Sequence, residues 1–259
     1  MKTKYPIILV HGIALKDYKF FKAFGRIENL LKENGFDVYT STTDGFGTIE
    51  NNAQQLKEQV EEIKKIHNVD KVNLVAHSKG GLDSIYMIEH LGMGSSVASL
   101  TTLSTPHKGS PIATFLLKLP KFLIKLLSFW VNLVYKIFKD KNPDSYKTCI
   151  QLKESDDVED KSLKVDKDIY VQSYSSTMKK SRDDFIMGIP LLFFKYQKKG
   201  DSDGMVSKES SKFGEYRGDM IDDSISHAEM VDFTINKSKK EKVYSFYLNL
   251  ANELFEKGF

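Results

Sequence analysis

The chain has 259 residues, of which 41% are hydrophobic, enough to bury a substantial core in one large α/β domain with an insertion. Its 38 Lys and Arg residues against 35 Asp and Glu residues leave a net charge of only +3, which argues against a dedicated nucleic-acid binder. A single cysteine, Cys149, excludes an internal disulfide, and no run of about twenty apolar residues requires a membrane-spanning helix.

Short apolar runs alternate with amphipathic stretches along the chain. The apolar runs predict strands at Ile7–Val10, Phe36–Thr40, Lys71–Ala76, Val97–Ser104, Asp168–Ser175 and Pro190–Tyr196. The amphipathic stretches predict helices at Tyr18–Asn34, Thr48–Ile66, Gly81–Leu91 and Lys239–Glu256. This alternation is typical of parallel βαβ units, so we expect an α/β fold with a mostly parallel central sheet and helices on both faces.

The N-terminal apolar run is only a few residues long and reads as the first core strand rather than as a signal peptide. Without such a leader, the sequence predicts a cytoplasmic protein unless a leader has been removed.

The segment 111–167 interrupts the alternation of strands and helices. Its first half is almost wholly apolar, and its few polar residues recur every three or four positions, in one stripe of a helix: Lys118, Lys121, Lys125, Ser128, Asn132, Lys136 and Lys139. Pro120 is expected to open a second helix there. The second half, from about Asp140 to Lys167, is charged and predicts a loop. We expect this insertion to lie on top of the sheet, within a single domain of residues 1–259.

The stretch AHSKG, from Ala76 to Gly80, follows a predicted strand and precedes a predicted helix. A sharp, strained turn between a strand and a helix needs small residues two places before and after its central residue, here Ser78, because the neighbouring backbone comes close. Such a turn lifts the serine hydroxyl above the sheet. It also directs backbone N–H groups, with Lys79 among them, at any oxyanion formed beside it. Ile13, after the first strand, could supply a second N–H donor.

A reactive serine also needs a base and a carboxylate that orients the base. Five of the six histidines are better explained by other roles than that of the base. His11 belongs to the oxyanion loop, and His77 lies on the serine turn. The other three are expected at helix ends (His67 and His90) or in a structural or substrate-shaping role at the cleft (His107). His227, in a polar loop after the last strand, is therefore the predicted base. The loop after Pro190–Tyr196 offers Asp201 and Asp203 as carboxylates, and Asp203 is preferred because the following glycine predicts a tight turn.

With these motifs in place, the chain resembles a bacterial triacylglycerol lipase of the α/β-hydrolase superfamily. The matching segments occur in the right order over most of the chain: YPIILVHGI, DGFGTIENNAQQL, NLVAHSKGG, TLSTPHKGSP, SDGMVS and SHAEMVD. The resemblance implies Ser78 as the nucleophile, Asp203 as the orienting acid and His227 as the base. It also implies oxyanion donors at Ile13 and Lys79, and a lid in the insertion.

Many lipases of this kind hold one calcium ion near the catalytic histidine, so the resemblance also implies a calcium site. Glu229, two residues after His227, would be one ligand, and Asp183 or Asp184 would be another, since calcium prefers oxygen ligands. Solvated surface acids without a metal are the alternative. The chemistry itself requires no cofactor.

The apolar face of the insertion decides between substrate classes. Packed over the cleft it would be hidden, whereas an opened lid would bury it in a lipid surface while its lysines meet head groups. The sequence thus predicts a serine hydrolase that cleaves carboxylic esters of lipids through an acyl-enzyme. The alternatives are a carboxylesterase, thioesterase or acyltransferase acting on soluble acyl substrates, and a non-catalytic membrane-docking protein.

Overall fold

The computed structural model describes residues 2–154, 168–184, 187–196 and 200–259 of the chain. Six strands form one parallel sheet in the order β2-β1-β3-β4-β5-β6. The strands are β1 (Ile7–Val10), β2 (Val38–Thr40), β3 (Val72–His77), β4 (Val97–Leu103), β5 (Tyr170–Ser175) and β6 (Glu215–Asp219). The first five of them confirm strands predicted from the sequence.

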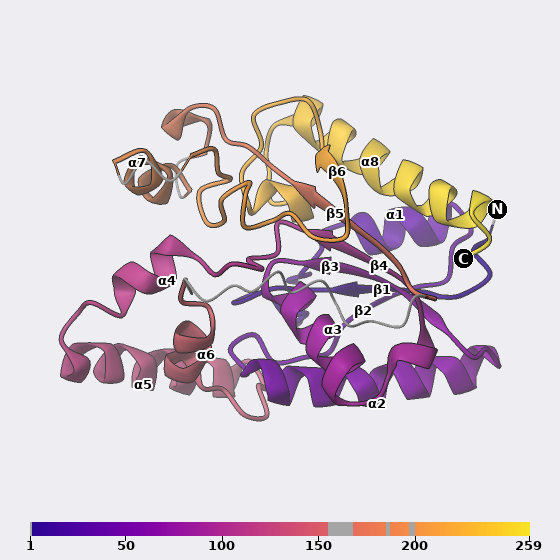
Figure 1. Ribbon diagram of the computed structural model, residues 1–259, viewed down its shortest axis with the longest axis horizontal. Helices are drawn as coiled ribbons and strands as arrows, with labels where there is room; N and C mark the ends of the chain where they lie inside the picture. The colour runs from indigo at the N-terminus through magenta and orange to yellow at the C-terminus, as the bar shows by residue number, and fades with distance from the viewer. Residues whose placement is uncertain (1, 155–167, 185–186, 197–199) are drawn as a thin grey trace.

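Helices cover both faces of the sheet (Figure 1). One face carries α1 (Ile27–Glu33) and α8 (Lys237–Glu256), and the other carries α2 (Ile49–His67) and α3 (Lys79–His90). Alternate residues of β1 supply the two cores: Ile7 and Leu9 pack in the cluster that contains α1 and α8, and Ile8 and Val10 pack with α2 and α3. This division follows from the two-residue period of a strand.

One predicted strand is wrong, and one strand of the sheet was not predicted. The run Pro190–Tyr196, predicted as a strand, lies in the helix α7 (Gly188–Tyr196). A short apolar run has no period that separates a strand from a buried helix, and a proline in the first helical turn is tolerated. The sixth strand is instead β6, a polar edge strand with the sequence EYRGD that an apolar pattern cannot find.

The predicted helix at Tyr18–Asn34 is shorter than expected, because α1 begins only at Ile27. The preceding residues turn instead: Asp17 Oδ1 accepts from the Ala23 N–H at 2.8 Å, and Lys19 and Gly25 have φ values of 50°. Within the described residues, three short 3₁₀ turns complete the secondary structure, at Gly94–Ser96, Ser181–Asp183 and Glu229–Val231.

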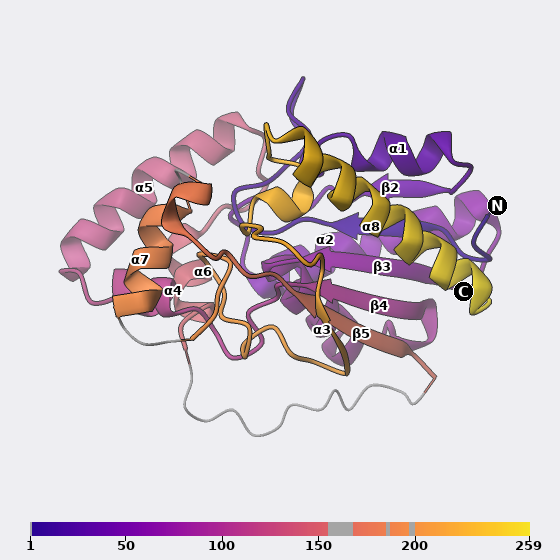
Figure 2. The same cartoon turned by 90° about the horizontal axis from the view of Figure 1, so that it is seen from above.

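In its described residues, the insertion between β4 and β5 forms three helices, α4 (Pro111–Leu116), α5 (Lys121–Ile137) and α6 (Ser145–Gln151). Pro120 stands at the N-cap of α5, which confirms that it opens a second helix. Figures 1 and 2 show α4, α5 and α6 together at one end of the sheet, away from the two chain termini. The part of the predicted loop at 155–167 lies outside the described residues. Among the described helices, none is long and apolar enough to cross a membrane.

Candidate active site

Ser78 occupies the turn between β3 and α3 with φ 55° and ψ −131°, a conformation that non-glycine residues rarely adopt. Close packing around the turn explains its small neighbours. A Cβ atom added to Gly80 would lie 2.6 Å from the carbonyl oxygens of both Val10 and His11, so α3 begins directly against the end of β1. The Ser78 N–H donates to Leu103 O of β4 at 2.9 Å. The strained strand-to-helix turn predicted from AHSKG is therefore present.

The predicted oxyanion loop passes beside this serine. A Cβ atom added to Gly12 would lie 2.6 Å from Ser78 Cβ and 3.2 Å from Ser78 Oγ, so only glycine leaves room for the two segments. Ile13, the next residue, lines the same cavity as Ser78. Lys79 is the first residue of α3, where backbone N–H groups have no partner inside the helix. The two predicted oxyanion donors are thus the residue after Gly12, which packs against Ser78, and the residue directly after Ser78.

His227 and Asp203, far apart in the sequence, form a buried pair. His227 Nδ1 lies 2.7 Å from Asp203 Oδ2, and the His227 N–H donates to Asp203 O at 3.0 Å. Asp203 Oδ1 accepts from the N–H groups of Met205 at 2.9 Å and Val206 at 2.8 Å. Burial raises the pKa of the Asp203 carboxyl, but the His227 charge and these hydrogen bonds outweigh it and hold the pKa below its ordinary value.

The tight turn expected around Asp203 is present, because Ser202 and Ser207 bridge across it. The sequence predicts a strand before this turn, but the element that precedes it is the helix α7. Asp201, the rejected alternative, is exposed to solvent. The structure therefore brings Asp203, and not Asp201, to His227.

Ser78 and His227 line one cavity of about 510 Å³. Within the described part of the chain, Ser78 Oγ makes no hydrogen bond to His227, an arrangement common in substrate-free sites, where catalytic contacts tighten on binding. The rest of the wall is mainly apolar and comes from the oxyanion loop, the insertion and the Asp203 turn, including Ile13, Leu15, Ile112, Leu116, Ile124, Leu127, Val131, Met187, Met205 and Val206. The site can accept a long apolar group next to a hydroxyl.

Comparison with known proteins supports the same conclusion. Residues 5–184 match the family model described as the alpha/beta hydrolase fold. The chain belongs to the α/β-hydrolase fold family. Over 261 aligned residues it is 31% identical to Triacylglycerol lipase 2 of Saccharomyces cerevisiae, covering 90% of this chain and 73% of that protein. This match to a lipase over 90% of the chain, together with the family match, identifies the chain as a carboxylic ester hydrolase.

One further relative and one solved structure are also similar to the chain. A triacylglycerol lipase of Pseudarthrobacter phenanthrenivorans is 38% identical over 120 residues, which cover 44% of this chain and 36% of that protein. The crystal structure of Staphylococcus hyicus lipase superposes with a TM-score of 0.68 at 14% identity, over 98% of this hydrolase and 96% of that chain. At such identity the superposition shows the fold alone.

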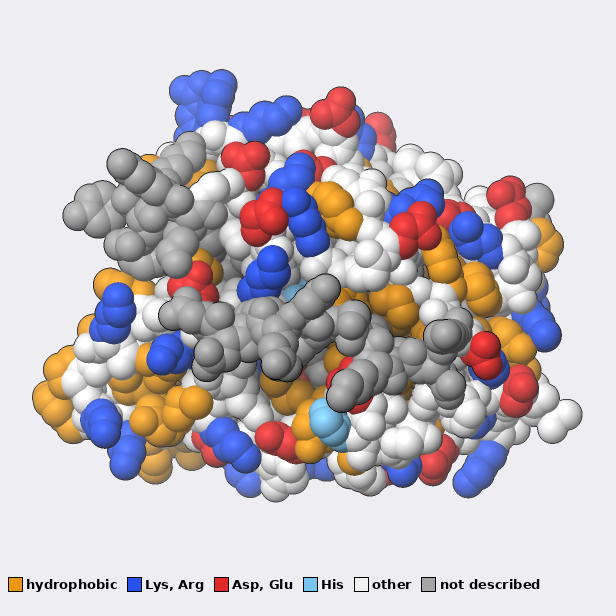
Figure 3. All heavy atoms as spheres, in the orientation of Figure 1, with side chains coloured by type: hydrophobic (Ala, Val, Ile, Leu, Met, Phe, Trp, Pro, Cys, Tyr) orange, Lys and Arg blue, Asp and Glu red, His pale blue; other side chains and the backbone are white. Residues whose placement is uncertain are grey.

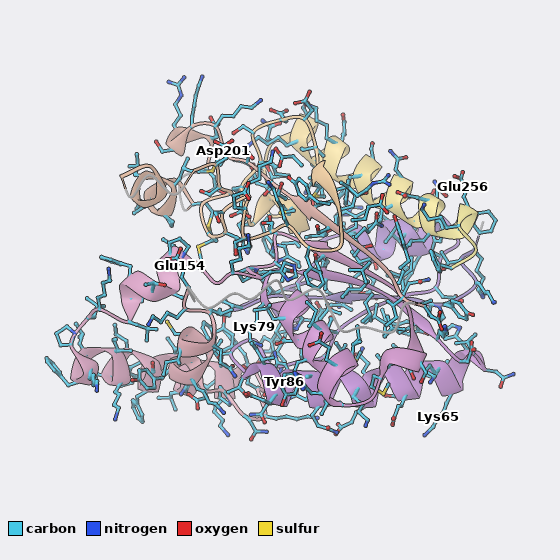
Figure 4. The ribbon with its side chains drawn as sticks, viewed as in Figure 1. Lys65, Lys79, Tyr86, Glu154, Asp201 and Glu256 are labelled. Carbon is cyan, nitrogen blue, oxygen red and sulfur yellow. The ribbon has the colours of Figure 1, made fainter. Side chains whose placement is uncertain are left out.

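Two residues next to the serine have roles that sequence analysis missed. His77 Nε2 lies 3.1 Å from His227 O, and the two rings are 4.4 Å apart. Lys79 is 2% exposed and turns its ammonium group inward, where Nζ lies 2.6 and 2.9 Å from the two Asp83 carboxylate oxygens (Figure 4). Burial raises the pKa of Asp83 to about 6, although the Lys79 charge opposes it. Only the i, i+4 spacing of Lys79 and Asp83 signals this pair in the sequence.

The residues predicted to bind calcium do not fit a metal site. Both carboxylate oxygens of Glu229 bind the Lys239 ammonium, at 3.0 and 2.8 Å. Asp183 instead accepts from Ser224 Oγ at 2.5 Å and from the Lys180 N–H at 3.1 Å. Among the described residues, no group of three or more His, Cys, Asp and Glu side chains could hold a metal ion. The Lys239 ammonium group already binds the Glu229 carboxylate that calcium would need.

His107 lies apart from the serine cavity, half-buried against Phe213 at a ring distance of 4.3 Å. Its Nε2 lies 3.3 Å from Thr102 Oγ1, and burial lowers its pKa to about 3. It therefore does not line the cleft at the serine, where the sequence placed it. Burial also lowers the pKa of His11 and His77 below 6.5.

These neutral histidines predict that the hydrolase loses stability on mild acidification. Below the ordinary histidine pKa of 6.5, the unfolded chain binds protons that the folded chain does not, so the free energy of unfolding falls as pH falls, by up to roughly 1 kcal/mol per pH unit for each histidine. Asp83, whose pKa is raised, acts in the opposite sense between 3.8 and about 6. Urea unfolding at a series of pH values measures the slope. His107→Gln should reduce it, and an unchanged slope would contradict the neutral state of His107.

Proposed function

We propose that this α/β-hydrolase cleaves carboxylic esters of lipids, with Ser78 as nucleophile, His227 as general base and Asp203 as the carboxylate that orients the base. The observation that carries the proposal is the 2.7 Å contact between His227 Nδ1 and Asp203 Oδ2 at the edge of an apolar cavity that also contains Ser78. Asp203 accepts a hydrogen bond from the Nδ1–H group of His227, which leaves Nε2 without a proton and able to receive one from serine.

The reaction proceeds in two halves. Ser78 Oγ attacks the ester carbonyl carbon while His227 Nε2 takes its proton, and the carbonyl electrons form an oxyanion that the Ile13 and Lys79 N–H groups stabilise. The intermediate collapses, and the alcohol leaves with the proton from His227. Water then attacks the acyl-enzyme, gives its proton to His227, and releases the acid with Ser78 restored. Each lost oxyanion donor would cost about 10²–10³ in rate.

The cavity wall favours an acyl chain over a polar substrate. Apart from the catalytic side chains, most of its lining residues are apolar, and α4, α5 and the Asp203 turn supply many of them. Burying each methylene of a chain there gives about 0.8 kcal/mol. Together with relatives that are named triacylglycerol lipases, this supports acylglycerols as substrates.

We assign the lid role to the insertion 111–167, because α5 carries apolar side chains on two sides. Ile124, Leu127 and Val131 line the cavity. The opposite side is open to solvent, with Phe122 75% exposed and Ile137 65% exposed, and includes Leu126, Phe129, Trp130 and Leu133. Figure 3 shows hydrophobic side chains gathered over α5, with lysines between them. An apolar helix face bordered by lysines suits a lipid surface with anionic head groups.

The C-terminal end of α5 is fixed to the body of the enzyme. Asp44 accepts from the N–H groups of Lys141 at 2.8 Å and Asn142 at 2.7 Å, and Asp140 accepts from those of Gly45 at 3.1 Å and Phe46 at 3.0 Å. Opening of the lid therefore involves the segment around Leu117–Pro120 rather than this anchored end.

The lid proposal predicts that activity on a medium-chain glycerol ester rises once the ester exceeds its solubility limit. Trp130→Asp should weaken lipid binding by roughly 10- to 100-fold, because burying a large apolar side chain contributes about 1.5–3 kcal/mol. The rise in activity at the solubility limit should then disappear. Hydrolysis of a dissolved p-nitrophenyl ester should stay unchanged. The matched control is Ile66→Asp, which charges an exposed apolar residue on α2, 62% exposed and outside the cavity wall.

The same assay separates the alternatives. A flat response across the solubility limit, with active hydrolysis of dissolved esters, would support a plain esterase, thioesterase or acyltransferase. Vesicle binding without labelling of Ser78 by a fluorophosphonate would support a membrane-docking protein.

A further inference from the structure

The loop that carries His227 is closed by a reciprocal pair of hydrogen bonds across the histidine. The Ser226 N–H donates to Glu229 Oε2 at 3.0 Å, and the Glu229 N–H donates to Ser226 Oγ at 3.3 Å. The two bonds close the four residues from Ser226 to Glu229, directly before the 3₁₀ turn Glu229–Val231. Ser226 Oγ in turn donates to Asp184 Oδ2 at 2.6 Å. The loop therefore has a fixed shape, but these contacts alone do not attach it to the helices.

The backbone of His227 is held by Asp203 O and His77, and the Glu229 end of the loop is attached to α8 by Lys239, the third residue of that helix. Its ammonium group binds both oxygens of Glu229, at 3.0 and 2.8 Å, and the two side chains are nearly buried. Thr234 Oγ1 adds a hydrogen bond to Glu229 Oε1 at 2.9 Å. Farther along α8, Tyr247 is buried in the core and donates to Met230 O at 3.0 Å. The Glu229 carboxylate is thus held against a 20-residue helix anchored in the core.

A single cation at this position can do what a divalent metal would do, because it neutralises the buried carboxylate and joins two segments of chain. Lysine has three donors on one compact charge, and two of them are used on Glu229. Because Lys239 is part of α8, the positive charge beside Glu229 is present without any bound metal ion. The Glu229 oxygens therefore have no free position for calcium.

We propose that Lys239 is a positioning residue that takes the place of a divalent cation and holds the His227 loop in its catalytic shape, so that catalysis is independent of calcium. The inference rests on the proposed function, in which His227 is the base. Removal of the ammonium leaves Glu229 buried and unpaired, which favours a loop shape that admits water to the carboxylate. His227 then moves relative to Ser78 while the cavity wall that binds the acyl chain stays in place.

The test compares the native enzyme with Lys239→Met, Lys239→Arg and a matched control, Lys242→Met. Lys242 lies on the same helix as Lys239, and its ion pair with Asp223 is exposed. We expect Lys239→Met to lower kcat on a dissolved p-nitrophenyl ester about 10²-fold with KM nearly unchanged, since a displacement of about 1 Å costs that much. Lys239→Arg should recover most of the loss because it keeps the charge. Lys242→Met should behave like the native enzyme.

The second arm needs no variant. In the native enzyme, kcat and the thermal unfolding midpoint should be the same in excess EDTA and in millimolar calcium chloride. A midpoint or a kcat that rises with calcium would overturn the inference, as would a Lys239→Met variant that keeps native kcat. If Lys239→Met does not fold, the EDTA and calcium comparison decides alone. A native enzyme that neither hydrolyses esters nor labels with a fluorophosphonate would instead refute the proposed function.

Discussion

Ser78→Ala is expected to lower kcat for ester hydrolysis by about 10⁵-fold or more, the effect of removing the nucleophile from a serine triad. The strained turn places the Ser78 hydroxyl beside Gly12 and in the apolar cavity that His227 also lines. Alanine keeps the cavity and the oxyanion donors but cannot form the acyl-enzyme. Fluorophosphonate labelling followed by peptide mapping should mark Ser78 in the native enzyme and nothing in the variant.

A matched control for this result is Ser84→Ala. Ser84 is also buried on α3, but its hydroxyl donates to Gly80 O at 2.7 Å and does not line the cavity. Its replacement should cost about 1 kcal/mol of stability and leave kcat within a few-fold of native. Hydrolysis retained by Ser78→Ala at the native rate would reject the assignment of the nucleophile.

Asp203→Asn is expected to lower kcat about 10⁴-fold while the fold persists, the magnitude seen when the orienting aspartate of a serine triad becomes an amide. The reason lies in the contacts of the two carboxylate oxygens. Oδ1 accepts from two backbone N–H groups, so the amide oxygen of asparagine takes that place and its NH₂ group faces His227 Nδ1. Nδ1 must then accept a hydrogen bond, which puts the proton on Nε2 and prevents it from receiving the serine proton.

The control for Asp203→Asn is Asp201→Asn, because Asp201 is exposed two residues away. It should keep kcat near the native value, and a large loss there with none in Asp203→Asn would reverse the choice of carboxylate. Stability adds a second measurement. The pKa of Asp203 is lowered in the folded state, so its contribution is complete above about pH 4 and is lost as pH falls through the folded value. Asp203→Asn should remove that part of the acid sensitivity.

The calcium hypothesis shows how a sequence motif can indicate a position but not its occupant. The acidic residue two places after His227 is present, and it does support the histidine loop. Its partner, however, is a lysine ten residues further on that nothing in the local sequence connects to it. The spacing of Ser226 and Glu229, three residues apart, is a local sequence signal for the shape of this loop, because it lets the two residues exchange hydrogen bonds.

The sequence by itself determined what short-range sterics and strand periodicity decide. The turn at Ser78, its small neighbours and the first five strands depend on residues next to one another, and all were predicted. Tertiary structure decided the rest, since a seven-residue apolar run forms α7 or a strand according to what it packs against, and β6 pairs at the sheet edge despite its polar residues. The Lys239–Glu229 pair likewise arises only when α8 docks beside the His227 loop, because the energy of a buried charge depends on neighbours that the fold supplies.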